Sequence, residues 1–135
     1  MTGDMVPGDS ELVDALLMEV AGLLRRLIEH GEEGSIDLLG LPLSSSCVAS
    51  LDQRLGQGEV TILLTAGGLS DIRETAFPGV WWTKHADEVG RVVAMLIEVA
   101  IVPAILRADL DDMTRGYQRL QNRVDIASGV YRRTA

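Results

Sequence analysis

The residues that could perform chemistry are few, and the most reactive type occurs once, as Cys47. It follows three serines at the start of an expected short helix, and a helix N-terminus can make a thiol reactive by lowering its pKa. A nucleophilic or redox role is therefore one hypothesis. A buried structural role is favoured, because cysteine is among the most frequently buried residue types. A single cysteine forms no disulfide within the chain and cannot hold an iron–sulfur cluster by itself.

The other candidate groups lack the spacing of a catalytic or metal site. His30 closes an expected helix and His85 lies beside Lys84 at an expected strand end, so neither has a second ligand nearby in the sequence. The pair Gly67-Gly68 is not followed by the lysine and the serine or threonine of a phosphate-binding loop. We therefore predict that the protein is not an enzyme and holds no cofactor and no metal.

The charge and the hydropathy pattern exclude two classes of partner. The chain has 135 residues and a formal net charge of −8, whereas binding to nucleic acid needs a basic face. No apolar run reaches the ~18 residues that a membrane-spanning helix requires. The N-terminus, Met1-Thr2-Gly3-Asp4, lacks the basic start of a signal peptide. We therefore expect no nucleic-acid binding, no membrane insertion and a cytoplasmic location.

The aromatic residues are concentrated in one segment, residues 73–82, which reads R-E-T-A-F-P-G-V-W-W. Trp81 and Trp82 are adjacent, so in a strand their side chains point to opposite faces of the sheet. Pro78 marks an edge or a bulge, and Gly79 permits a sharp bend. Either an exposed tryptophan on a bent β-ribbon contacts another protein, or both tryptophans pack in the core of a kinked strand. The candidate partner-binding residues are Arg73, Glu74, Thr75, Phe77, Pro78, Gly79, Trp81 and Trp82.

Hydrophobic periodicity predicts two helices in the first half of the chain. Apolar residues at steps of three and four predict a first helix, which Asp9 or Ser10 caps and Gly31 ends. The serines at 44–46 offer caps for a second, shorter helix that ends at Gly56. Both helices are amphipathic, so each is expected to bury one face against another element.

Strands and a third helix follow. Segments rich in strand-forming residues are 59–66, 69–77, 80–85 and 91–99. Within the last segment, the run 92–97 is apolar on both faces, so this segment is expected to be the central, covered strand. Pro103 suits the first turn of a third helix. The predicted fold is α+β, with an antiparallel three- to four-stranded sheet covered by N- and C-terminal helices in the order α-α-β-β-β-α.

We expect one domain with two short flexible ends. The predicted boundaries are a flexible N-terminus at residues 1–10, a single domain at 11–127 and a flexible tail at 128–135.

The first helix carries an apolar stripe with a repeat of 3.5 residues. Such a stripe suits pairing between helices, so it predicts a homodimer as one alternative. Packing of the stripe on the domain's own sheet is the other and is favoured, because two heptads are too few to specify a coiled coil. The stripe consists of Val13, Leu16, Val20, Leu23 and Leu27.

Residues 74–82, E-T-A-F-P-G-V-W-W, resemble the signature of the C-terminal domain of the HupH/HyaF-type hydrogenase expression proteins. Two flanking stretches support the resemblance at the expected distances. The upstream stretch is residues 36–44, I-D-L-L-G-L-P-L-S, followed by 51–52, L-D, and 55–60, L-G-Q-G-E-V. The downstream stretch is residues 97–99, I-E-V, followed by 103–106, P-A-I-L.

The resemblance implies an accessory role in the maturation of nickel–iron hydrogenases. Its implied partners are the iron–sulfur small subunit of a hydrogenase, which it would chaperone or assemble by protein–protein binding, or other hydrogenase accessory proteins. It implies no catalytic residues. The alternative is a self-associating structural protein or a companion subunit of a hydrogenase complex. For the accessory role the segment 74–82 is the best candidate for the contact surface, whereas self-association would use the apolar stripe of the first helix.

Overall fold

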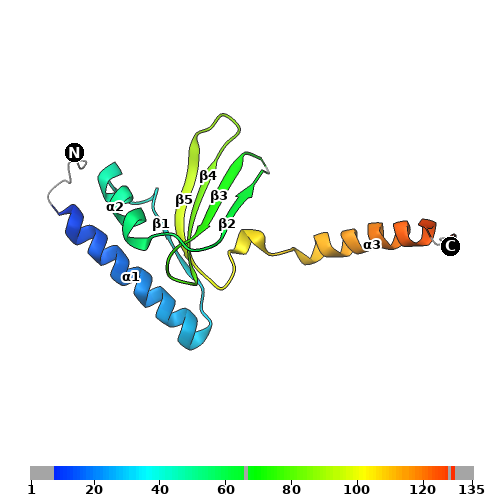
Figure 1. Ribbon diagram of the computed structural model, residues 1–135, viewed down its shortest axis with the longest axis horizontal. Helices are drawn as coiled ribbons and strands as arrows, with labels where there is room; N and C mark the ends of the chain where they lie inside the picture. The colour runs from blue at the N-terminus through cyan, green and yellow to red at the C-terminus, as the bar shows by residue number, and fades with distance from the viewer. Residues whose placement is uncertain (1–7, 66, 128, 130–135) are drawn as a thin grey trace. The chain divides into compact units, whose positions relative to one another are not determined.

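The computed structural model divides the chain into two compact units, residues 1–104 and 105–135 (Figure 1). It describes residues 8–65, 67–127 and 129. The two ends that were expected to be flexible, residues 1–10 and 128–135, lie mostly outside these described residues. Within the described part of the first end, residues 9 and 10 already belong to a helix.

The first unit contains a five-stranded sheet in which every pair of neighbours is antiparallel, so the α+β class is confirmed. The strand order is β1-β5-β4-β3-β2. The strands are β1 (Gly34–Asp37), β2 (Thr61–Leu64), β3 (Leu69–Glu74), β4 (Val80–Ala86) and β5 (Val92–Val99). The fifth strand is β1, which lies outside the four strand segments predicted from the sequence. It joins the sheet by pairing with the second half of β5.

The central strand is β4, whereas residues 91–99 had been expected in that position. Residues Val80 to Thr83 of β4 are all buried, while Val92 and Val93 at the start of β5 are exposed. The reason lies in the register, because β1 pairs only with residues 96–99 of β5. The first half of β5 therefore has a neighbouring strand on one side only, in spite of its apolar sequence.

Two helices, α1 (Asp9–His30) and α2 (Ser45–Leu55), pack on one face of the sheet (Figure 1). The apolar stripe of α1 lies in the core of this unit, so it packs on its own sheet. Burial of such aliphatic side chains is worth about 1.5–3 kcal/mol each and holds the helices in place. The buried core on this face consists of Val13, Leu16, Val20, Ile36, Leu38, Cys47, Leu51, Leu55, Val80, Trp82, Ile97 and Val99.

The starts of α1 and α2 are tied together by side chains. The prediction that Asp9 or Ser10 caps α1 is wrong, because the helix begins at Asp9 itself, after Gly8. The hydroxyl of Ser44 instead donates to the carboxylate of Asp9 at 2.8 Å and accepts from the backbone N–H of Cys47 at 3.0 Å. The expected cap of α2 is thereby confirmed at Ser44. The end of α1 at Gly31 is also confirmed.

The second unit contains the helix α3 (Leu110–Ala127), described here by itself. A 3₁₀ turn, η1 (Ala104–Leu106), follows Pro103, and α3 begins later than expected. The carboxylate of Asp109 accepts from the backbone N–H groups of Asp111 at 3.1 Å and Asp112 at 3.3 Å, so Asp109 caps the helix. That this helix covers the sheet, as the sequence pattern indicates, stays a prediction.

Candidate functional site

The segment singled out from the sequence forms the hairpin turn between β3 and β4. Thr75 N–H donates to the carbonyl of Val80 at 3.0 Å, and Val80 N–H donates to the carbonyl of Phe77 at 3.0 Å. Between these residues lie Pro78 and Gly79, and Gly79 has a φ of 90°. Proline followed by a glycine with positive φ is the pattern of a type II turn. Pro78 and Gly79 were expected to bend a strand, and they form a complete turn between two strands instead.

Side chains on both sides fix this turn. Thr75 is buried, and its hydroxyl oxygen accepts from the backbone N–H of Phe77 at 3.2 Å. On the other side a Cβ added at Gly79 would lie 3.2 Å from Cδ1 of Leu24, so the turn rests directly against α1. The side chain of Phe77 is therefore presented from a rigid base.

Both tryptophans are core residues, which is the second of the two interpretations that the sequence left open. Trp81 and Trp82 are each 7% exposed and point to opposite faces of the sheet. Trp82 belongs to the core under α1 and α2. On the other face, the indole N–H of Trp81 donates at 3.0 Å to the carbonyl of Ala100, which directly follows β5. Neither tryptophan can act as an exposed anchor in this conformation.

Arg73 and Glu74 make contacts inside the domain. The guanidinium of Arg73 lies 5.6 Å from the ring centre of Trp82 and is ion-paired with Asp52 of α2. Its Nε is buried and has no hydrogen-bond partner among the described residues. The carboxylate of Glu74 accepts from the backbone N–H of Glu59 at 3.1 Å. These two side chains therefore make contacts inside the domain and position the base of the turn.

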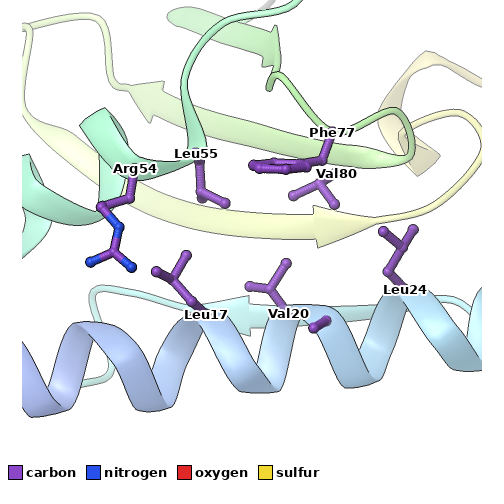
Figure 2. Close-up of a pocket in the computed structure, with 8 residues that line it drawn as sticks. Leu17, Val20, Leu24, Arg54, Leu55, Phe77 and Val80 are labelled. Atoms are coloured by element: carbon purple, nitrogen blue, oxygen red, sulfur yellow. The ribbon is translucent and has the colours of Figure 1, made fainter.

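The tip of the turn opens onto an apolar groove. Phe77 is 48% exposed, and Pro78 beside it is exposed too. Figure 2 shows Leu17, Val20 and Leu24 rising from α1 toward the ring of Phe77. The groove has a volume of about 280 Å³. It is lined by Leu17, Val20, Ala21 and Leu24 of α1, Arg54 and Leu55 at the end of α2, and Phe77 and Val80 of the turn.

The groove has one charged group, at its edge. Arg54 donates to the carboxylate of Asp14 on α1 at 3.3 Å, and both side chains are about half exposed. Sequence reasoning identified Phe77 but none of the helical residues of the groove. Their apolar spacing gave the buried face of each helix, yet it could not indicate which of these residues would border a gap beside the turn.

Cys47 has the surroundings of a structural cysteine. It is fully buried at the start of α2, and this burial raises the pKa of its thiol. The carboxylate of Asp9 adds to the rise, because a nearby negative charge disfavours the thiolate. Both effects oppose the lowering that a helix N-terminus can produce, and a thiol that stays protonated is a poor nucleophile.

The described residues offer no group of three histidine, cysteine, aspartate or glutamate side chains that could hold a metal ion. His85 is hydrogen-bonded to the hydroxyl of Ser70, its neighbour on β3. Among residues 8–65 and 67–127, no helix combines the length and the apolar character needed to cross a membrane.

The chain is similar to proteins that are named for hydrogenase expression or formation. The family model described as the HupH hydrogenase expression protein, C-terminal conserved region, matches residues 12–127. The hydrogenase expression/formation protein HupQ of Azotobacter chroococcum mcd 1 is 30% identical over 124 residues, which are 88% of this chain and 43% of that protein. HoxQ of Azotobacter vinelandii is 30% identical over 123 residues, which are 85% of this chain and 44% of that protein. The chain thus spans less than half the length of these relatives.

The fold is similar to a solved structure as well. The hydrogenase expression protein HupH from Thiobacillus denitrificans ATCC 25259 is 39% identical, with a TM-score of 0.81. The match covers 87% of this chain and 96% of that one. The resemblance seen in residues 74–82 is therefore confirmed along nearly the whole chain. This chain belongs to the family of HupH hydrogenase expression proteins and carries their C-terminal conserved region.

Proposed function

We propose that this protein is a non-catalytic accessory factor in the maturation of nickel–iron hydrogenases. In this proposal it binds the iron–sulfur small subunit in the cytoplasm, before that subunit is assembled, through the groove beside Phe77. The relatives support the process, because they are named hydrogenase expression or formation proteins. The proposed mode of action rests on one observation, which is the open apolar groove beside the turn in residues 74–82.

The groove has the physical properties of a binding site for an apolar side chain of a client. The backbone of Phe77 is held by the turn and by Thr75, so little backbone freedom is lost when a partner covers this residue. Aromatic side chains at such positions are frequent centres of binding energy. A subunit that has not yet met its permanent partner exposes the apolar surface of a future interface. The groove could cover part of such a surface during this interval.

The surroundings of Cys47 support a role without catalysis. Its thiol is buried and has a raised pKa, so it is unsuited to carry a covalent intermediate. The contribution of the chain would then be the shape and apolar character of one surface, with the chemistry of cluster assembly left to other proteins.

Co-purification from cells that produce a nickel–iron hydrogenase tests this proposal. The tagged wild-type protein should retain the small subunit, and Phe77→Asp should lose it, because a carboxylate cannot be buried against an apolar client. Val89→Asp is the matched control, since Val89 is 75% exposed and lies at the opposite end of β4. Thermal unfolding should confirm that both variants are folded. Equal retention by both variants, or no retention by the wild type, would refute the proposal.

A further inference from the structure

The helix α3 carries a regular apolar stripe along one face. Its residues recur at steps of three and four, which is the 3.5-residue repeat of helices that pair along their length. Each of them is between 51% and 73% exposed. The stripe consists of Leu110, Met113, Tyr117, Leu120 and Val124.

A glycine in the middle of α3 lies beside this stripe. Glycine inside a helix is unfavourable compared with alanine, so it needs a reason. A Cβ added at Gly116 would have no neighbour closer than 3.9 Å, the distance to a guanidinium nitrogen of Arg119. Packing within the described chain therefore does not require glycine here. Gly116 follows Met113 by three residues and precedes Leu120 by four, so it lies at the edge of the stripe. There it would permit close approach of a second helix.

The charges of α3 are distributed unevenly along its length. The start, residues 109–116, carries Asp109, Asp111, Asp112 and Arg115, and Arg115 is ion-paired with Asp112. The second half carries Arg119, Arg123 and Asp125, so the start is acidic on balance and the second half is weakly basic. Two copies side by side in the same direction would place the acidic starts together, whereas in opposite directions each acidic start meets a weakly basic half and the helix dipoles also attract. The net charge therefore favours the antiparallel arrangement over the parallel one.

We propose that α3 pairs in antiparallel orientation with α3 of a second copy of this chain, through the stripe and around Gly116. The arrangement is a two-fold interface, in which the same surface of each copy is used. The helix has 18 residues and so a length of about 27 Å. With ~90 Å² for each of the ten stripe side chains, the dimer buries on the order of 900 Å², which is below the ~1,200 Å² of standard stable interfaces and in the range of weak, transient ones. The dimer is accordingly weak, with a dissociation constant in the micromolar range.

This proposal places self-association on α3, whereas the sequence pattern suggested α1. The stripe of α1 has the same repeat but lies in the core of the first unit. The groove beside Phe77 belongs to that first unit, so the two proposals can fail independently.

Sedimentation equilibrium of the full chain between ~5 and ~300 μM tests the dimer. The wild type should shift from monomer to dimer in this range, and Leu120→Asp should weaken association at least ~30-fold. Ile126→Asp is the matched control, because Ile126 is 79% exposed and lies about 200° around the helix from Val124. A monomeric mass up to ~300 μM, or equal effects of both variants, would overturn the proposal. Phe77→Asp should leave the association unchanged.

Disulfide trapping tests the orientation. In a Cys47→Ala background, a chain with Leu110→Cys is mixed with a chain with Val124→Cys and oxidised. Antiparallel pairing brings these two positions together, so the mixed disulfide should predominate. Predominance of disulfides between identical chains would overturn the antiparallel arrangement. Gly116→Leu, measured by sedimentation, should weaken association as well, and unchanged association would contradict close approach at Gly116.

Discussion

Replacement of Phe77 by alanine separates the stability of the domain from its affinity for a client. A phenylalanine side chain offers ~200 Å² of apolar surface. Because Phe77 is 48% exposed, the domain covers about half of it and leaves about half for a partner. At ~25 cal/mol per Å², each half is worth about 2.5 kcal/mol. Alanine keeps the Cβ, so the expected loss of unfolding free energy is smaller, about 1.5–2 kcal/mol.

The expected loss of affinity comes from the other half of the ring. If a client covers it fully, Phe77→Ala weakens binding by up to about 2.5 kcal/mol, which is ~60-fold in Kd. Urea unfolding followed by tryptophan fluorescence measures the first effect, and titration with purified small subunit measures the second. Trp82→Ala is the contrasting variant. Trp82 is 7% exposed, and its removal from the core should cost about 3–5 kcal/mol of stability.

The two effects have to appear together for the groove to be the contact surface. A Phe77→Ala variant that loses the expected stability but binds the small subunit within ~3-fold of the wild type would refute the reasoning. In that case Phe77 would serve the domain alone, as the tryptophans do.

Three further predictions concern the turn, the cysteine and a charged loop. Gly79→Ala should lower the unfolding free energy by about 1–2 kcal/mol, because alanine is strained at a φ of 90° and its Cβ would press on Leu24; urea unfolding equal to that of the wild type would contradict this. Cys47 should react with thiol reagents in urea but hardly at all in the native protein at neutral pH, because it is buried and its thiol pKa is raised; rapid native labelling would count against the structural role. The backbone N–H and then the guanidinium of Arg91 lower the pKa of Asp87 below its ordinary value. The folded-state pKa is therefore the lower one, so this stabilisation is present above the unfolded-state pKa and is lost as the pH falls through the folded-state pKa. Carboxyl NMR titration should give a midpoint below that of an exposed aspartate, and Asp87→Asn should flatten the acid limb of the stability curve.

The local signals in the sequence predicted the parts of the fold that depend on one or two residues. The glycine at 31 ends α1 and Ser44 caps α2. Pro78 and Gly79 were expected to bend a strand, and they form the turn between β3 and β4 instead. The strand β1 was missed because its four residues, G-S-I-D, are too short to show a period. Only Ile36 of this strand is buried, and pairing with β5 decides its conformation.

Only part of the candidate site could be predicted, because packing between segments far apart in the sequence decides the rest. Alternation along a strand placed Trp81 and Trp82 on opposite faces but could not say that both faces are covered. The cover of Trp81 includes the chain at Ala100, far from it in sequence. Phe77 was identified from its own segment, whereas Leu17 and Leu24 border the groove only because α1 packs beside the turn.

Site-specific photo-crosslinking from position 77 tests the central claim most directly. A photoreactive phenylalanine analogue is placed at Phe77, or at Val89 as the control, in cells that produce a nickel–iron hydrogenase. The expected result is a crosslink from position 77 to the iron–sulfur small subunit, with none from position 89. Crosslinks from position 89 alone, or no small-subunit crosslink from position 77 while hydrogenase still matures, would contradict binding in the groove.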